Sequence, residues 1–165
     1  MPDPVVSLPS RSRARSAGFT LVELVTVVVL LGILAATGLP RLAQWRTESR
    51  VNVAQATAAA LRVAAKNAHY AWALQSSDTG SVTISLHDGG VAYMWHAYPD
   101  AGNCCAPDGI EALIDLNGID VNRLNNTQTR FDVQGAPTPD QCGAMYTEAV
   151  NVGDTFIVTL TTSGC

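Results

Sequence analysis

Residues 16–40 read SAGFTLVELVTVVVLLGILAATGLP, and this stretch decides how the rest of the chain is interpreted. Residues 24–39 contain no charged side chain. Residues 19–39 are enough to cross roughly 30 Å of hydrocarbon as a helix. One carboxylate, Glu23, lies near the start of the apolar run, where a charge costs about 2.5–3.5 kcal/mol if it lies deep in a membrane. The stretch therefore predicts an apolar helix with a carboxylate that needs an explanation.

Basic residues precede this apolar run, which is the order found in export signals. Arg11, Arg13 and Arg15 outnumber the single acid Asp3. A secretory signal cleaved after the small residues 35–38 would fit this order, and so would a plain membrane anchor with Glu23 at the interface. Neither interpretation gives the carboxylate a function.

Charge is distributed unevenly over the remainder of the 165 residues, of which 15% are charged against roughly 25% in an ordinary soluble domain. Residues 41–66 carry five cations and one acid, whereas residues 67–165 carry two arginines and eleven acids. A binding surface for nucleic acid needs clustered cations, so the acidic part argues against nucleic acid as a partner. The length suits one domain and argues against a two-domain enzyme.

Residues 41–77 predict a continuation of the helix, because they contain no Gly or Pro and are rich in Ala. A helix over residues 19–76 would be roughly 85 Å long, so that about half of it must project into a membrane or a filament. Small apolar residues recur at helical spacing and predict a packing stripe. The stripe consists of Val53, Ala56, Ala60, Leu61, Ala64, Ala68 and Trp72.

Residues 78–165 predict short strands and turns. Residues 81–86 and 91–97 flank Asp88-Gly89-Gly90 and indicate a hairpin, and residues 145–150 and 155–160 indicate a second one. Residues 128–133 form a further candidate strand, and residues 108–118 predict a short helix capped by Asp108. One small antiparallel sheet packed on the C-terminal half of the long helix would give an α+β fold.

The string around Gly18 is the most specific motif in the chain. A basic leader ends in Gly18, Phe19 follows, and Glu23 stands four residues later, ahead of the apolar run. This pattern resembles the cleavage and methylation site of type IV prepilins, and the chain is identified as a member of the type IV pilin family. The resemblance implies that prepilin peptidase cuts between Gly18 and Phe19 and methylates the new amine. It also implies that Glu23 pairs with the Phe19 ammonium of a neighbouring subunit, an attraction that is strong where the dielectric constant is low.

The same resemblance divides the chain into a leader (residues 1–18), a transmembrane and assembly helix (19–40), an amphipathic half-helix (41–77) and a β-rich headgroup (78–165). Gly32 and Pro40 match helix-softening positions of the family. Proline removes one helical hydrogen bond, so a kink or break is expected at Pro40, and the resemblance implies unwinding there in filaments. Residues 31–42 (LGILAATGLPRL), 142–150 (CGAMYTEAV) and 156–165 (FIVTLTTSGC) resemble the mannose-sensitive haemagglutinin group, whereas residues 76–140 hardly do.

Four cysteines lie in the part that would be exported, where disulfides persist, and they allow three pairings. They are Cys104, Cys105, Cys142 and Cys165. Pairing Val150 with Thr155 across the second hairpin brings Cys142 near Cys165, and the resemblance implies the same bond, worth about 3 kcal/mol. For Cys104 and Cys105, a vicinal disulfide, free thiols, a bond between subunits and bonds to Cys142 and Cys165 all stay open.

Other groups of polar and aromatic residues give weaker signals. Residues 115–122 alternate oxygen ligands but lack the Gly and Glu that a calcium loop requires, so a turn is expected. Tyr93, Trp95 and Tyr98 could stack against a sugar, but strand spacing puts Tyr93 and Trp95 on one face and favours core packing. His69, His87 and His96 show no ligand spacing. We expect no metal, no cofactor and no catalysis.

The resemblance implies the structural subunit of a pilus filament, a helical homo-oligomer that supports attachment and, as a further expectation, motility. Its partners would be prepilin peptidase, an assembly platform and a motor ATPase. The subunit would cross the inner membrane once before assembly and then lie in the extracellular pilus. Two alternatives are a pseudopilin of a secretion system and a membrane-anchored module that binds a ligand at Tyr93, Trp95 and Tyr98.

Overall fold

The computed structural model describes residues 19–75, 80–85, 90–102 and 109–165. The chain divides into two compact units, Met1–Arg41 and Leu42–Cys165. Helix α1 (Leu21–Gln75) begins in the first unit and ends in the second. In the first unit every described residue from Leu21 onward is helical.

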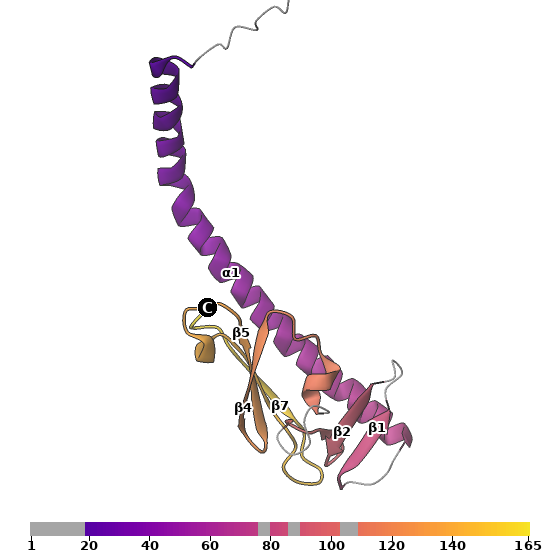
Figure 1. Ribbon diagram of the computed structural model, residues 1–165. Coiled ribbons are helices and arrows are strands. Elements are labelled where there is room, and N and C mark those ends of the chain that lie inside the picture. The colour runs from indigo at the N-terminus through magenta and orange to yellow at the C-terminus, as the bar shows by residue number, and fades with distance from the viewer. Residues whose placement is uncertain (1–18, 76–79, 86–89, 103–108) are drawn as a thin grey trace, which may run out of the picture. The chain divides into compact units, whose positions relative to one another are not determined.

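Two antiparallel sheets follow the helix in the second unit (Figure 1). The first has the order β1-β2-β3, from β1 (Val82–Ser85), β2 (Val91–Trp95) and β3 (Tyr98–Pro99). The second has the order β4-β5-β6-β7, from β4 (Ile119–Asn125), β5 (Gln128–Val133), β6 (Gly143–Thr147) and β7 (Ile157–Thr161). The predicted α+β arrangement of a long helix on antiparallel strands is confirmed, but the single sheet that the sequence predicts is wrong.

The core of the second unit lies between α1 and these sheets. Residues 54–65 of the helix pack on the four-stranded sheet around Phe131 and Tyr146. Ala68, further along the helix, packs on the three-stranded sheet against Ile84 and Met94. Small side chains on the helix let the strands approach closely. Successive segments of the same helix therefore pack against the two sheets.

The buried stripe of α1 differs in part from the predicted one. Leu61 and Ala68 are buried as predicted, whereas Val53, Ala56 and Ala60 are exposed. Alanine occupies so many positions here that two neighbouring stripes fit the helical spacing equally well. The stripe that packs is Ala54, Ala58, Leu61, Ala65 and Ala68.

The register of the last hairpin is shifted by one residue from the prediction. Thr147 of β6 lies opposite Ile157 of β7, rather than Val150 opposite Thr155. Glu148, the residue after β6, donates its N–H to the carbonyl of Thr127, and its carboxylate accepts from the N–H of Ala101. The loop between β6 and β7 is therefore longer than predicted.

The predicted helix at residues 108–118 is reduced to one short 3-10 turn, η1 (Ile110–Leu113), and a second turn, η2 (Pro139–Gln141), precedes β6. The predicted cap, Asp108, and the turn residues Asp88 and Gly89 lie outside the described residues. After η1 the carboxylate of Asp115 accepts from the N–H of Asn117, as expected for an Asx turn.

Candidate functional site

The start of α1 carries the sequence motif that singles out Phe19 and Glu23. Phe19 lies ahead of the helix with 82% of its surface exposed. The Thr20 hydroxyl accepts a hydrogen bond from the Glu23 N–H at 3.2 Å. This is half of a capping box, in which a Thr at the N-cap and a Glu three residues later satisfy the first free N–H groups. The Thr-x-x-Glu spacing of residues 20–23 is the sequence signal that indicates this cap.

Glu23 therefore has a structural role as well as the predicted role in assembly. An acid in the first turn interacts favourably with the positive end of the helix dipole. Its side chain is exposed, and none of the ion pairs found among the described residues involves it. Gly18, the other half of the predicted cleavage site, lies outside the described residues.

The first part of α1 exposes a continuous apolar surface. The large apolar side chains between Leu21 and Leu39 are each between 47% and 78% exposed. In the described part of the chain, α1 is the one helix long and apolar enough to cross a membrane, with a mean hydropathy of 2.4 over its most apolar window. Such a surface requires contact with lipid or with other protein.

The helix shows no interruption at Gly32 or Pro40. Both residues lie within α1, so the helix is not broken at either of them, while the kink that was also expected at Pro40 stays a prediction. Proline cannot donate the one helical hydrogen bond at this position, but the hydrogen bonds of the helical residues on either side stabilise the helix enough to continue through it. Space is open around Gly32, since a Cβ built there would have no neighbour within 4 Å. Unwinding in an assembled filament stays a prediction.

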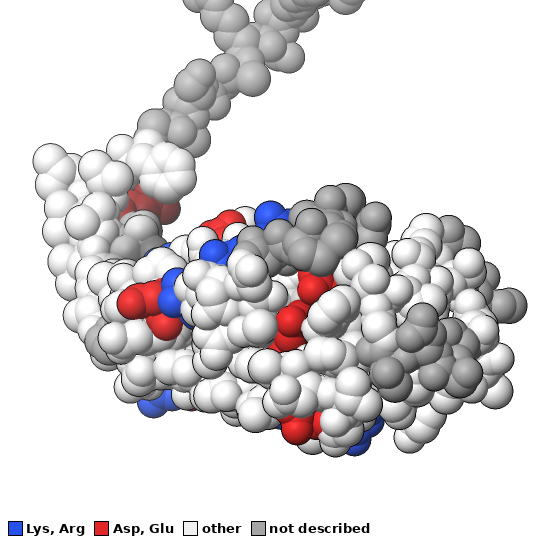
Figure 2. All heavy atoms as spheres, turned by 90° about the horizontal axis from the view of Figure 1, so that it is seen from below, with Lys and Arg blue, Asp and Glu red and all other residues white. Residues whose placement is uncertain are grey.

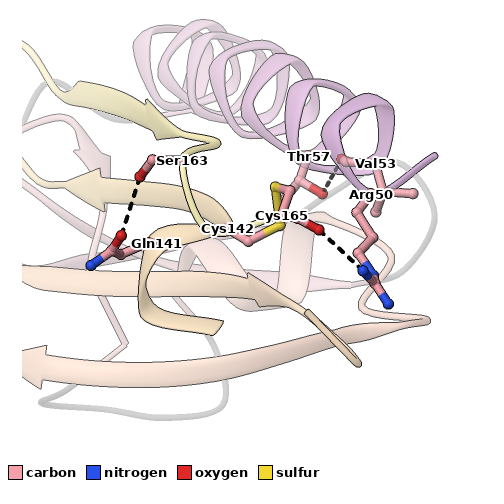
Figure 3. Close-up of a disulfide and its surroundings, with 7 residues drawn as sticks. All are labelled: Arg50, Val53, Thr57, Gln141, Cys142, Ser163 and Cys165. Carbon is pink, nitrogen blue, oxygen red and sulfur yellow. Dashed lines mark hydrogen bonds between the residues drawn. A yellow bond between two sulfur atoms is a disulfide. The ribbon is translucent and has the colours of Figure 1, made fainter. Parts of the chain in front are cut away.

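The Cys142–Cys165 disulfide is present, as expected. It joins the start of β6 to the last residue, with 4.8 Å between the Cα atoms. Arg50 of α1 donates to the backbone carbonyl of Cys165 at 3.1 Å, and both sulfur-bearing residues are buried (Figure 3). The disulfide and this hydrogen bond tie the end of the chain to the helix. Cys104 and Cys105 lie outside the described residues.

The strand spacing of Tyr93 and Trp95 predicted that both would pack in the core, and this prediction is wrong. Ala92 and Met94 face the core, while Tyr93 and Trp95 lie on the opposite face and stay partly exposed. The face of β2 that is buried is therefore the opposite of the predicted one. Tyr98 is separate from them, and its ring stacks on His69 with centroids 4.6 Å apart.

Two carboxylates that the sequence did not single out lie beside Tyr93 and Trp95. Asp100 and Glu148 are 4% and 6% exposed. Burial, and secondarily the neighbouring Asp100, raise the pKa of Glu148 to about 7. Burial, followed by the charges of Glu148 and Asp100, raises the pKa of Tyr146 well above its usual value. No sequence motif connects Asp100 with Glu148, which come together only in the fold.

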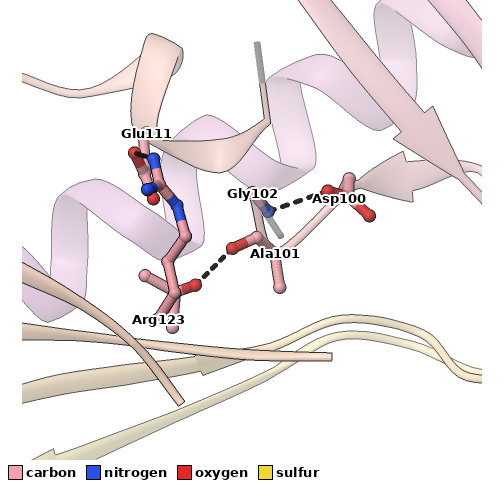
Figure 4. A network of polar contacts seen from close by, with 6 residues as sticks. Asp100, Ala101, Gly102, Glu111 and Arg123 are labelled. Atoms are coloured by element: carbon pink, nitrogen blue, oxygen red, sulfur yellow. Dashed lines mark hydrogen bonds and ion pairs between the residues drawn. The ribbon is translucent and has the colours of Figure 1, made fainter. Parts of the chain in front are cut away.

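A second polar group lies close by. Arg123 donates to Glu111 at 2.6 Å, and Gly102 approaches the same carboxylate closely enough that a Cβ there would lie 2.8 Å from its Oε1 (Figure 4). Gly102 also has a positive φ of 83°, which glycine adopts readily. This arrangement packs η1 against the chain that follows β3 and is structural in character.

Metal and nucleic-acid binding find little support in the described residues. Among them no group of three or more His, Cys, Asp or Glu side chains could hold a metal ion. On the face seen in Figure 2, the Lys and Arg side chains lie apart from one another rather than in one basic patch. The absence of nucleic acid as a partner stays a prediction.

The described residues thus combine an exposed apolar helix that has a carboxylate in its first turn with a helical segment packed on antiparallel sheets. Residues 13–39 match a family model described as the prokaryotic N-terminal methylation motif. The chain is similar to the type IV major pilin protein PilA of Myxococcus xanthus (strain DK1622), with 29% identity over 133 residues.

The aligned region covers 79% of this chain and 59% of that relative, so the chain spans less than two thirds of the relative's length. No solved structure shows a significant match. The motif and the relative show that the chain is similar to type IV pilins over part of its length. That this chain is not an enzyme stays a prediction.

Proposed function

We propose that the chain is the structural subunit of a type IV pilus filament on the bacterial surface. The observation that carries the proposal is the exposed apolar surface of α1 between Leu21 and Leu39, preceded by the methylation motif. Burying one such side chain contributes about 1.5–3 kcal/mol. Lipid covers this surface before assembly, and the helices of neighbouring subunits cover it afterwards.

Apolar contact alone does not favour leaving the membrane, because lipid tails are as apolar as leucine. Glu23 supplies a polar driving force. Its carboxylate lies in the first turn of α1 without an ion-pair partner among the described residues. Cleavage after Gly18 creates an ammonium at Phe19, and a neighbouring subunit's ammonium then relieves the desolvation of Glu23.

Maturation and location follow from this proposal. Prepilin peptidase removes residues 1–18 and methylates Phe19, residues 19–40 anchor and then assemble the subunit, residues 41–77 complete the helix, and residues 78–165 form the headgroup. An inner-membrane platform and a motor ATPase drive polymerisation. The subunit moves from the inner membrane, which it crosses once, into an extracellular homo-oligomeric filament.

Within the family we place the chain in the mannose-sensitive haemagglutinin group, on the strings at residues 31–42, 142–150 and 156–165. A role in attachment, and in motility where the filament retracts, belongs to the same proposal. It draws support from the similarity to a major pilin.

The test is to shear surface filaments from cells that express the chain and to measure the intact mass of their subunits. We expect long filaments whose subunit begins at N-methylated Phe19 and contains one Cys142–Cys165 disulfide. Short periplasmic assemblies without sheared filaments would indicate a pseudopilin. A subunit beginning near Gly38, or a monomeric anchored protein, would contradict the proposal.

Replacing Glu23 by Gln tests the assembly step separately. Glutamine keeps the side-chain length and can complete the capping box, so α1 should still form and insert. We expect the membrane fraction to contain normal amounts of the Glu23→Gln subunit, while the yield of sheared filaments falls at least tenfold. Glu48→Gln, which removes an exposed carboxylate further along α1, is the matched control and should assemble normally.

A further inference from the structure

A cavity of about 280 Å³ opens on the headgroup where the three-stranded and four-stranded sheets meet. Its lining comes from strand β2, the residue after β3, the turn between β4 and β5, and the residue after β6. These lining residues are Tyr93, Trp95, Asp100, Asn126, Thr127 and Glu148. The cavity lies entirely within the second unit and takes no part in the proposed assembly through α1.

Backbone hydrogen bonds fix the acidic side of this cavity. The Glu148 carboxylate accepts from the Ala101 N–H at 2.7 Å, and the Asp100 carboxylate accepts from the Gly102 N–H at 2.8 Å. Both carboxyl groups line the same cavity, and the neighbouring Asp100 contributes to raising the pKa of Glu148. Figure 4 shows Asp100 held in this way by the backbone of Gly102.

Neighbouring hydrogen bonds make this arrangement rigid. The Glu148 N–H donates to the Thr127 carbonyl at 3.0 Å, and the Tyr146 hydroxyl donates to the Pro99 carbonyl at 2.7 Å. The Thr129 hydroxyl donates to the Ala101 carbonyl. The last two bonds join the chain around β3 to the four-stranded sheet, and the first holds Glu148 to the residue before β5, so the two carboxyl groups are preorganised rather than carried on a free loop.

Aromatic side chains form the other side of the cavity. Tyr93 and Trp95 lie on the face of β2 that points away from the core, and Trp95 is 37% exposed. A large aromatic surface held at the rim of a cavity can contact a ligand at little further cost in conformational entropy. Aromatic faces attract cations, by about 0.5–2 kcal/mol depending on how well the site is desolvated.

We propose that this cavity binds a small organic ammonium ion, with the cation seated between the aromatic side chains of Tyr93 and Trp95 and the carboxyl groups of Asp100 and Glu148. The described residues that line the cavity include no Lys or Arg. Arg123 and Arg130 lie on the strands that flank the turn at Asn126 and Thr127, and they form ion pairs with Glu111 and Asp132. Within the described lining, the negative charge of the carboxyl groups is therefore not neutralised by a cationic side chain.

A neutral ligand of the same size fits this chemistry less well. A hexose could stack on Trp95 and hydrogen-bond to Asn126 and Thr127, but it would leave the repulsion between the two carboxyl groups unrelieved. An ammonium ion relieves this repulsion and gains the attraction of the aromatic faces as well. Charge, rather than shape, should therefore decide which ligands bind.

Binding should be linked to the protonation of Glu148. Because burial raises the pKa of Glu148 to about 7, its carboxyl group is mostly protonated at pH 6 and mostly ionised at pH 8. The other titratable groups around Glu148 are Asp100, the phenol of Tyr146 and the imidazole of His96, whose Nδ1 lies 3.2 Å from the Ala149 carbonyl. Affinity should therefore rise about tenfold from pH 6 to pH 8.

The experiment uses the full-length chain in a non-ionic polyoxyethylene detergent, which carries neither a sugar nor an ammonium group. Choline is titrated calorimetrically at pH 6 and pH 8, and the neutral isostere 3,3-dimethylbutanol and glucose are titrated under the same conditions. We expect choline to bind, its affinity to rise about tenfold between the two pH values, and the isostere and glucose to bind at least tenfold more weakly at pH 8.

Variants then assign the site. Trp95→Ala should weaken choline binding at least tenfold, and Glu148→Gln should both weaken it and remove the dependence on pH. The matched controls are Trp45→Ala and Glu48→Gln, which alter an exposed indole and an exposed carboxylate on α1 and should bind as the unchanged chain does. Circular dichroism and thermal unfolding of each variant verify folding, and Trp95→Phe, which keeps an aromatic face, replaces Trp95→Ala if that variant unfolds.

Three outcomes would overturn the proposal. Choline and its neutral isostere could bind equally well, which would make the cavity a non-specific apolar site. Glucose could bind and choline fail, which would make it a site for neutral sugars. A folded Glu148→Gln chain could bind choline with unchanged affinity and unchanged pH dependence, which would place any binding elsewhere on the molecule.

Discussion

Glu148 gives the headgroup a stability that depends on pH in a defined direction. Its pKa is raised from 4.5 to about 7, so between these values the folded chain holds a proton that the unfolded chain releases. The free energy of unfolding therefore falls as the pH rises through this window, by at most about 3 kcal/mol, and the stabilisation is complete only below it.

Glu148→Gln should flatten this dependence, because its amide oxygen can still accept the Ala101 N–H while the titrating group is gone. The measurement is thermal unfolding of both chains at pH 5 and pH 8. The unchanged chain should lose stability relative to the variant at pH 8. Parallel profiles for the two chains would show that this carboxyl does not govern the dependence.

Gly143 is required by close packing rather than by a special backbone angle. A Cβ at this position would overlap the carbonyl oxygen of Phe131 on the neighbouring strand β5. Gly143→Ala should therefore force β5 and β6 apart and lower the free energy of unfolding by about 1–3 kcal/mol. Denaturant unfolding measures the loss, and Gly38→Ala is the control, because a Cβ there has no neighbour within 4 Å.

At the scale of single residues, the sequence reveals groups whose pattern is local and hides groups that depend on distant partners. Glu23 stands out as a carboxylate in an apolar run and Phe19 because it follows Gly18, while their roles in cleavage and assembly stay predictions. Asp100 and Glu148 are ordinary acids in their own segments and become unusual only when β3 and β6 meet. Tyr93 and Trp95 were placed on one face correctly, but spacing alone cannot tell which face of a strand is buried.

The last hairpin, β6–β7, is the element that the disulfide secures. The bond closes a loop across a separation of 23 residues and holds the tail against α1 through Arg50. Replacing both Cys142 and Cys165 by Ala should lower the free energy of unfolding by about 3 kcal/mol, chiefly through the greater entropy of the unfolded chain. Urea unfolding of the oxidised protein and of the double variant measures this difference.

Ser163→Ala is the control for the disulfide, since it changes the same tail and removes only a side-chain hydrogen bond to Gln141. It should alter stability by less than about 1 kcal/mol. Equal stability of the double cysteine variant and the unchanged chain would contradict a stapling role.

The alternation of apolar and polar residues in the sequence predicts some of the strands and not others. β5 and both hairpins were predicted, because apolar and polar residues alternate in them. β4 was missed, since it lies at a sheet edge and carries Asp120, Asn122 and Arg123, which have little preference for strands. With β4 unseen, the separation into two sheets could not be predicted either.

The second unit has its own core, whereas the described residues of the first unit form none. Residues 42–165 contain both hydrophobic clusters and the Cys142–Cys165 disulfide. The described residues 19–41 bury almost nothing within the chain. The two units should therefore differ in the solvent they require.

A chain that begins at Leu42 should consequently fold in water without detergent, because no residue of either hydrophobic cluster is removed with residues 1–41. We expect a monomer by analytical ultracentrifugation, an oxidised disulfide by mass spectrometry and a cooperative unfolding transition. The full-length chain is the control and should need detergent or assemble, because the exposed side chains between Leu21 and Leu39 associate in water. If the shortened chain aggregates or unfolds without cooperativity, the headgroup depends on residues 1–41, and the apolar helix would then be part of the fold rather than the surface that other subunits cover.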